Sequence, residues 1–288
     1  MNHLAEITFG YADLGDITLH YAAAGTGDKL VILLHGFPEF WYSWRYQLGA
    51  LGREYTVVAP DMRGYNLSGK PSGRSAYRVG SVADDICRLI KHFDRDTAAV
   101  IGHDWGASVA WTLAKTRPDV LWKLGALQVP PAHVWKRNQT AAQLFASWYM
   151  FFFQLPWLPE LILRRGDYRK LEGALRNAIS RDVITDADIA QYKKAWRQPG
   201  ALTAMLNYYR ANIAGRLLKK SEPPEKIAVS TLFIYAEKDE AILPQTVEGV
   251  GEAVSGPYLE HRIPNCGHWV QHEAHEEVTR VIRDFLAG

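Results

Sequence analysis

The motif Gly102-His-Asp-Trp-Gly106 is the part of the chain that most clearly indicates chemistry. It follows an apolar run that ends at Ile101 and precedes a helix-like stretch over residues 107–115. Small residues at its first and fifth positions permit a sharp strand-to-helix turn, which lifts the middle side chain out of the path of the backbone. We therefore expect Asp104 to be a nucleophile, rather than only the N-cap of the next helix.

A carboxylate nucleophile at residue 104 suits the displacement of a leaving group from a saturated carbon. Its attack leaves an ester, which water and a histidine can hydrolyse. A serine in the same place would leave an ether, which they cannot cleave. Since an aspartate is ionised at neutral pH, the first step needs no base.

Hydrolysis of that ester needs a base and a group that orients it. His268 lies in Asn265-Cys-Gly-His-Trp269, between the last expected strand and the last helix, and Asp239 follows the strand before. The chain order nucleophile, acid, histidine is typical of residues that follow different strands at one edge of a sheet. We expect His268 to activate water and Asp239 to hold the imidazole, with Glu237 and Glu240 as alternatives for the acid.

The hydrolysis also requires donors for an oxyanion. The segment His35-Gly-Phe-Pro-Glu39 follows a buried apolar run, which is where such a loop belongs. We expect the backbone N–H groups of Phe37 and Trp105 to form the oxyanion hole.

Predicted strands and helices that could position these residues alternate along the chain. Apolar or alternating runs predict strands, and a helical face headed by Ser81 as its N-cap predicts a helix over residues 82–93. A last helix is expected over 270–285. Strands alternating with helices predict an α/β fold with a mostly parallel sheet covered on both faces. The expected strands are 17–21, 30–34, 56–59, 98–101, 229–235 and 258–263.

The strand pattern stops near Gln128, and residues 131–222 are helical and aromatic. This stretch holds 15 Lys and Arg against 7 Asp and Glu, although the whole chain has a formal net charge of only +2. We expect core residues 1–130, a helical cap over 131–222 and a second core part over 223–288. The basic charge is expected on a solvated outer face.

Composition excludes several classes of protein. With 48% hydrophobic and 22% charged residues the chain is not disordered as a whole, and its small net charge argues against nucleic-acid binding. Two cysteines indicate neither a disulfide scaffold nor a zinc cluster, and the first residues do not look like a secretory signal, so we expect a cytoplasmic location. The apolar stretch 145–163 contains Gln154, Pro156 and Pro159, which argue against a membrane span.

Taken together, these motifs resemble those of the epoxide hydrolases of the α/β-hydrolase fold. The resemblance covers nearly the whole chain and includes His35-Gly-Phe-Pro-Glu-Phe-Trp-Tyr-Ser-Trp-Arg45, Ala59-Pro-Asp-Met-Arg-Gly-Tyr65, Gly102-His-Asp-Trp-Gly106 and Gly267-His-Trp269. It implies hydrolysis of a small apolar epoxide by water to a vicinal diol, with an aspartate nucleophile, no cofactor or metal, and a helical cap that carries two tyrosines.

Family patterns place the two tyrosines. One stands four residues before a run that here is Phe153-Gln-Leu-Pro156, which points to Tyr149. The other lies in Leu206-Asn-Tyr-Tyr-Arg210, which points to Tyr209, with Tyr208 as the neighbour that could be confused with it. Phenol hydroxyls of this kind would protonate the departing alkoxide. We expect the substrate to contact Phe37, Trp105, Trp148, Tyr149, Phe152, Tyr209 and Trp269.

Three alternatives remain at this point. A haloalkane dehalogenase would use the same Asp104, but it typically presents Asn or a second Trp to the halide, and this chain has Phe37 after His35-Gly36. A catalytically silent binding protein would leave the ordered polar residues unexplained. A metal-dependent hydrolase could use His268, His272 and His275, but His272 and His275 lie one residue short of the zinc-binding HExxH spacing and are interpreted as part of a solvated helix.

Overall fold

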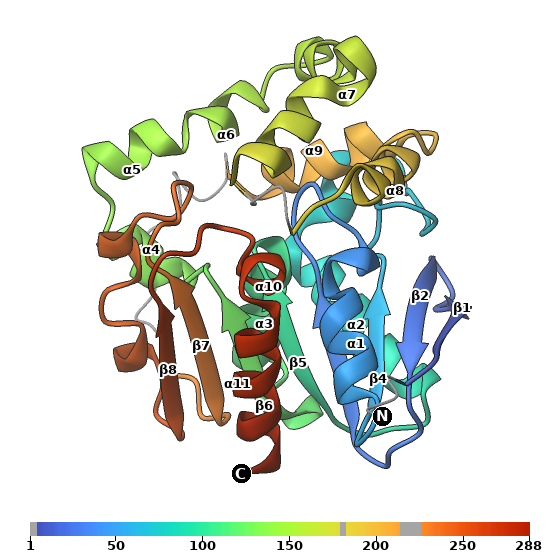
Figure 1. Cartoon of the computed structure of the whole chain (residues 1–288), viewed down its shortest axis with the longest axis vertical. Coiled ribbons are helices and arrows are strands. Elements are labelled where there is room, and N and C mark those ends of the chain that lie inside the picture. The colour runs from blue at the N-terminus through green and yellow to red at the C-terminus, as the bar shows by residue number, and fades with distance from the viewer. Residues whose placement is uncertain (1–4, 179–182, 214–225) are drawn as a thin grey trace.

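The computed structural model describes residues 5–178, 183–213 and 226–288. Within these residues the centre of the molecule is an eight-stranded sheet with the strand order β1-β2-β4-β3-β5-β6-β7-β8 (Figure 1). Strand β2 runs antiparallel to β1 and β4, and all other neighbours are parallel. The predicted α/β fold is therefore confirmed. The strands are β1 Ile7–Asp13, β2 Thr18–Ala24, β3 Leu30–Leu34, β4 Thr56–Pro60, β5 Ala98–His103, β6 Leu121–Leu127, β7 Thr231–Ala236 and β8 Tyr258–Ile263.

Helices cover both faces of the sheet, because its central strands are apolar on both sides. In β3 the side chains of Val31 and Leu33 belong to the cluster beneath α1 Arg45–Leu51 and α11 His275–Ala287. Those of Leu30, Ile32 and Leu34 belong to the cluster beneath α2 Val79–His92 and α3 Trp105–Thr116. All five are fully buried. Burial of each contributes about 1.5–3 kcal/mol, so this strand is a main source of stability.

The remaining long helices lie between β6 and β7 in sequence. Figure 1 shows α5 to α9 across one end of the sheet, and Tyr209 of α9 contacts Trp105 just beyond the carboxyl end of β5. Helix α7 is broken at Arg165–Tyr168, where three successive residues have positive φ. The helices are α4 Ala132–Arg137, α5 Ala141–Ala146, α6 Trp148–Phe152, α7 Leu158–Ala178, α8 Asp186–Trp196 and α9 Ala201–Asn212.

The structure differs from the predicted elements at the start of α2, within the last helix and in two additional strands. Helix α2 begins at Val79, so Ser81 lies inside the helix and is not its N-cap. The Val79 N–H donates instead to the Asn212 Oδ1 at 3.1 Å, which is the role expected of a cap. The expected last helix is interrupted at Ala274 into α10 Val270–Glu273 and α11. Strands β1 and β6 were not predicted. Short 3₁₀ turns span Trp41–Trp44, Arg74–Tyr77, Pro118–Val120, Pro244–Val247 and Val250–Ala253.

The apolar stretch 145–163 lies on α5, α6 and α7. Among the residues that the structure describes, no helix has both the length and the apolar character needed to span a bilayer. The expected boundary at residues 222 and 223 lies outside the described residues.

Candidate active site

Asp104 lies at the predicted sharp turn between β5 and α3. Its φ is 52°, and its side chain makes no capping hydrogen bond to α3. The turn depends on the two glycines of the motif. A Cβ at Gly102 would overlap the backbone of Gly106, and a Cβ at Gly106 would overlap the backbone carbonyl of Leu34. Positions 102 and 106, two residues before and two after Asp104, therefore have a steric reason to be glycine, and the Asp104 side chain does not cap the helix.

The loop after β3 holds one oxygen of this carboxylate. The Phe37 N–H donates to the Asp104 Oδ1 at 2.7 Å. Gly36 allows this approach, since a Cβ there would overlap the Asp104 side chain. His35 is fully buried and fixes the loop, because its Nε2 accepts from the Met62 N–H at 3.0 Å and its Nδ1 lies 3.0 Å from the Gly36 carbonyl oxygen. The Phe37 N–H, which the sequence predicts as an oxyanion donor, thus contacts the Asp104 carboxylate.

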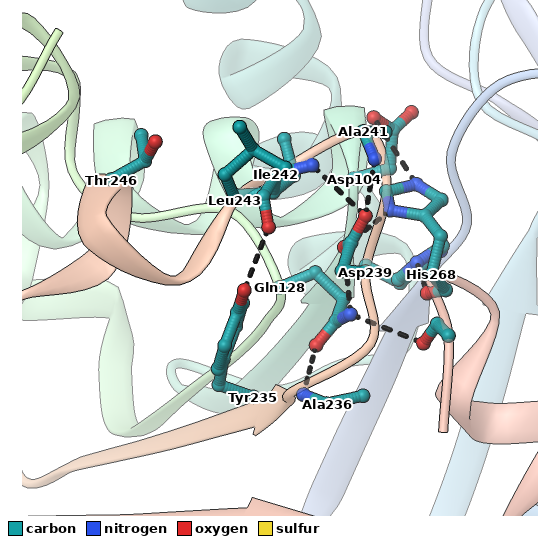
Figure 2. Close-up of polar contacts among 12 residues, drawn as sticks. Asp104, Gln128, Tyr235, Ala236, Asp239, Ala241, Ile242, Leu243, Thr246 and His268 are labelled. Carbon is teal, nitrogen blue, oxygen red and sulfur yellow. Dashed lines mark hydrogen bonds and ion pairs between the residues drawn. The ribbon is translucent and has the colours of Figure 1, made fainter. Parts of the chain in front are cut away.

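His268 lies on the other side of the carboxylate. Its Nε2 is 3.9 Å from the Asp104 Oδ2, and its Nδ1 is 2.8 Å from the Asp239 Oδ2 (Figure 2). Asp239 is buried, whereas Glu237 and Glu240 are exposed, so the structure brings only Asp239 of these three acids to the imidazole. The chain thereby forms the arrangement of carboxylate, imidazole and orienting acid that the sequence predicts.

Neighbouring carboxylates set the charge of His268. Burial alone would lower the pKa of the imidazole, but the charges of Asp239, Asp104 and Glu39 and the hydrogen bond that the imidazole donates to Asp239 outweigh it and raise the pKa to about 9. At neutral pH this raised pKa favours the imidazolium form of His268.

Two buried side chains that sequence reasoning missed hold the histidine loop. The His103 Nε2 lies 2.8 Å from the backbone carbonyl oxygen of His268. The Gln128 Nε2–H donates to the Asp239 Oδ2 at 2.7 Å and to the Gly267 carbonyl oxygen at 3.2 Å. His103 stands beside the nucleophile in the motif that was singled out, but nothing local in the sequence pointed to Gln128.

Glu39, the last residue of the loop motif, is the centre of a buried polar network. Its carboxylate lies 3.1 Å from the His103 Nδ1 and 2.9 Å from the His272 Nε2, and it accepts from the Gln271 side chain. Although burial favours the neutral acid, the hydrogen bonds from His103 and His272 keep the pKa of Glu39 far below its ordinary value. The interpretation of His272 as part of a solvated helix was therefore wrong, since His272 and its neighbour Gln271 are fully buried.

Five aromatic rings form a cluster around the nucleophile, which we call the aromatic cluster. The Tyr209 ring lies 5.3 Å from that of Phe37, 5.1 Å from Trp105, 5.9 Å from Tyr149 and 5.0 Å from Phe153, measured between centroids. Phe37 and Trp105 belong to the core, and the other three rings come from α6, the residue after it, and α9. The structure thus brings both predicted tyrosines together, with Tyr209 against Phe37, whose N–H binds Asp104, and against Trp105, which follows Asp104 in the chain.

The tyrosine hydroxyls are suited to donate protons. Burial and the negative charge of Asp104 raise the pKa of Tyr149 and of Tyr209 well above the ordinary value, so both phenols are protonated. The neighbouring Tyr208 has another role, since its hydroxyl donates to the Arg63 carbonyl oxygen at 2.9 Å. Geometry therefore separates Tyr209 from Tyr208, which sequence spacing alone did not.

The other three residues predicted to contact the substrate, Trp269, Trp148 and Phe152, differ in their burial and in their distance from the aromatic cluster. Trp269 is buried and its ring meets that of His268 edge-on at 5.1 Å. Trp148 is 61% exposed and contacts Phe152, so the structure does not bring it into the aromatic cluster. Phe152 is half-buried and lies beside Phe153, which occupies the cluster instead.

The residues considered for a metal site are separated. His272 belongs to the Glu39 network, and the His275 ring stacks on Tyr46 at 4.1 Å. In the described parts of the chain no group of three or more His, Cys, Asp or Glu side chains is arranged to hold a metal ion. Both cysteines are free thiols, and burial raises the pKa of Cys266 to about 11, which makes it a poor nucleophile.

The fold and this geometry agree with a known family. The family model described as the alpha/beta hydrolase fold matches residues 29–275, which include Asp104, Asp239 and His268. The chain belongs to the α/β hydrolase family. In this α/β hydrolase the site lies where β3 is flanked by β4 and β5, the switch point at which open α/β sheets bind their ligands.

Several known proteins are similar to this chain over most of its length. The α/β hydrolase is 42% identical over 280 residues to the AB hydrolase superfamily protein YfhM of Bacillus subtilis, covering 96% of each chain. It is 35% identical over 277 residues to epoxide hydrolase 3 of the mouse, covering 94% of this chain and 74% of the relative. A crystal structure of the Bacillus megaterium epoxide hydrolase with an inhibitor matches with a TM-score of 0.90 at 30% identity, covering 97% of this chain and all of the other.

Proposed function

We propose that this α/β hydrolase is an epoxide hydrolase, which converts an oxirane and water to a vicinal diol through a covalent ester on Asp104. One observation carries the proposal. The Asp104 carboxylate has one oxygen held by the Phe37 N–H and the other beside the His268 Nε2, with Tyr149 and Tyr209 in the aromatic cluster around it. The likeness to proteins named epoxide hydrolases supports it.

In the first step the Asp104 Oδ2 attacks a ring carbon, and the bond from that carbon to the epoxide oxygen breaks. An alkoxide is a poor leaving group, so a donor must meet the oxygen as it departs. Tyr149 and Tyr209 supply hydroxyls from α6 and α9, and burial together with the negative charge of Asp104 raises the pKa of both, which keeps them protonated until attack. A tyrosine hydroxyl gives its proton to this oxygen, so the step produces a hydroxyalkyl ester of Asp104 and a tyrosinate.

Formation of the ester prepares the second step. The Asp104 charge disappears, and with it one of the contributions that raise the pKa of His268. The imidazolium can then pass its proton to the tyrosinate left by ring opening, and the neutral imidazole can accept a proton from water while Asp239 holds its Nδ1 side. The reaction therefore changes His268 from a cation beside the nucleophile into a base.

The second step adds hydroxide to the ester carbonyl carbon. If the ester forms through Oδ2, the carbonyl oxygen is Oδ1, which already accepts from the Phe37 N–H. We propose the Trp105 N–H as the second donor. It is the first amide of α3, and the first amides of a helix have no acceptor within the helix. The tetrahedral intermediate collapses, and the bond between the Asp104 carbonyl carbon and the product oxygen breaks. The proton of the Asp104 carboxylic acid that forms passes to the departing alkoxide, so the diol is released and the Asp104 carboxylate is restored.

In this proposal residues 131–222 act as a cap that brings the tyrosines to a core formed by 1–130 and 223–288. Contacts between Tyr209 and both Phe37 and Trp105 support the role of α9. We also propose a small apolar substrate, since the groups around Asp104 are aromatic, and a cytoplasmic location, with which the two free thiols agree.

Product analysis tests the proposed activity against dehalogenation. Purified enzyme is incubated with styrene oxide and, separately, with a terminal bromoalkane, and diol and bromide are both measured. We expect diol from the epoxide at a rate far above bromide release, because the tyrosines serve a leaving group that needs a proton. Bromide release without diol formation would replace the proposal with dehalogenation.

A further inference from the structure

Gln128 is a fully buried residue at the carboxyl end of β6, between the strand that leads to Asp104 and the strand that leads to Asp239. Its backbone N–H donates to the Ile234 carbonyl oxygen of β7 at 2.9 Å, and its φ is 68°. A positive φ is sparsely populated by residues other than glycine, and such strain clusters at functional sites. In this conformation the Gln128 side chain makes three hydrogen bonds.

The Gln128 amide joins three backbone segments. Its Oε1 accepts from the Ala236 N–H at 2.7 Å, at the end of β7 (Figure 2). Its Nε2–H donates to the Asp239 Oδ2 at 2.7 Å and to the Gly267 carbonyl oxygen at 3.2 Å. One side chain therefore ties the end of a strand to the loop of the acid and to the loop of the histidine.

The contact with Asp239 falls on the oxygen that matters for His268. The Asp239 Oδ1 accepts from the N–H groups of Ala241 and Ile242 at 2.7 and 2.9 Å. The Oδ2 accepts from Gln128 and from the His268 Nδ1. Asp239 is 2% exposed, so a lost donor would not be replaced freely by water. Without Gln128 the Oδ2 keeps only the imidazole as partner.

We infer that Gln128 is a positioning residue for the ester-hydrolysis step, a role that rests on the proposed function. Its amide binds both the Asp239 Oδ2 and the carbonyl oxygen of Gly267, the residue before His268. These two contacts hold the imidazole so that its Nε2 stays directed at Asp104. Ring opening depends on Asp104 and the tyrosines, none of which Gln128 contacts. Loss of Gln128 should therefore slow the second chemical step and leave the first nearly unchanged.

Gln128→Met tests this directly, because methionine has a similar length and neither donates nor accepts strongly. The enzyme is mixed rapidly with styrene oxide, quenched in acid, and the fraction of ester is followed by intact-protein mass spectrometry. We expect hydrolysis of the ester to slow about 10- to 100-fold, as misplaced catalytic groups commonly do, with alkylation changed less than about threefold. The ester should accumulate, and kcat and KM should fall together.

Gln47→Met is the matched control. Gln47 is also a fully buried glutamine, and its Nε2–H donates to two backbone carbonyl oxygens, of Gln271 and His275. This variant should lose stability without a change in the ratio of the two chemical rates. If both variants lower that ratio alike, Gln128 is only a structural residue and the inference is wrong.

Gln128→Glu gives a second test in case the methionine variant folds poorly. The introduced carboxyl would face Asp239, with His268 and Glu273 as the other titratable groups at the histidine loop. Carboxyls that share a site raise one pKa strongly. The protonated acid can donate to Asp239 as the amide does, so ester hydrolysis should be nearly normal at low pH and fall as pH rises. Hydrolysis with the pH profile of the wild type would overturn the inference.

The two proposals fail in distinguishable ways. If the wild-type enzyme forms no ester with any epoxide, the proposed function is wrong. If the wild type forms the ester and Gln128→Met hydrolyses it at the normal rate, only the role of Gln128 is wrong.

Discussion

The Phe37 N–H already donates to the Asp104 Oδ1 at 2.7 Å in the free protein. In the proposed mechanism, attack through Oδ2 would leave this hydrogen bond in place, so the N–H that orients the carboxylate would also donate to the oxyanion of the second step. Such preorganisation avoids reorganising the donors during reaction. The two loops after β3 and β5 are thus joined at the reacting group itself.

Gly36→Ala should disrupt this contact. A Cβ at Gly36 would overlap the Asp104 Cβ and carboxylate, so the nucleophile must move. We expect alkylation by styrene oxide to slow about 100-fold or more, the effect of a displacement of about 1 Å. Gly80→Ala is the control, since a Cβ there meets no atom within 4 Å and lies in α2. A Gly36→Ala enzyme with the alkylation rate of Gly80→Ala would show that this approach is unimportant.

Substitutions in the triad should separate the two steps. Asp104→Ala removes the nucleophile, so diol formation should be lost. His268→Gln retains the nucleophile but removes the base, so the enzyme should gain the mass of one epoxide and hold it. Intact-protein and peptide mass spectrometry measure both. Normal turnover by His268→Gln would refute the assigned base.

The tyrosines should act on ring opening. We expect Tyr149→Phe and Tyr209→Phe each to slow alkylation by about 10- to 100-fold, and the double variant to slow it far more, because one remaining donor can partly serve the alkoxide. Single-turnover mixing measures this rate. Tyr208→Phe is a close control. It loses the hydrogen bond to the Arg63 carbonyl, worth about 1 kcal/mol of stability, and should alkylate normally. A double variant as fast as the wild type would remove the tyrosines from the mechanism.

The charge of Asp104 should control the protonation of His268. The pKa of His268 is raised to about 9, and Asp104 is one of the causes, after Asp239. In Asp104→Asn, which resembles the ester in charge, the pKa should fall toward neutrality. Titration of labelled histidine by NMR measures it in both proteins. A pKa that stayed the same or rose in the variant would contradict the proposed switch from cation to base.

The same shift has a consequence for stability. The folded pKa of about 9 lies above the ordinary value of 6.5, so the folded state binds this proton more tightly. Its contribution to the free energy of unfolding is fully present below about pH 6.5 and is lost as pH rises through about 9. Urea unfolding across this range should show a loss that is smaller in Asp104→Asn. An equal loss in both proteins would argue against coupling between the two residues.

The sequence was most informative for candidate site residues that stand directly after a strand. Asp104 and Asp239 each stand just beyond a buried apolar strand, and parallel strands bring their carboxyl ends to one edge. Their proximity to His268 could therefore be expected. The edge strand β1 was not predicted, since Phe9 and Tyr11 are exposed and it is not buried like the central strands.

Other features depended on tertiary contacts that no local pattern contains. Gln128 is defined by loops more than 100 residues away in sequence, and the cap of α2 comes from Asn212. In α6 the sequence favoured Trp148 and Phe152 as substrate contacts, but the orientation of this short helix leaves Trp148 exposed and places Phe153 in the aromatic cluster. The sequence shows that this segment is rich in aromatic residues, but the packing of α6 against α9 determines which of their rings belong to the aromatic cluster.

The central claim is that a carboxylate oxygen of Asp104 becomes an oxygen of the diol. A single turnover of excess enzyme with styrene oxide in water enriched in ¹⁸O tests it most directly, with mass spectrometry of the diol and of the peptide that contains Asp104. The account predicts an unlabelled diol and one ¹⁸O atom in the Asp104 carboxylate. Label in the diol, with none in Asp104, would contradict it.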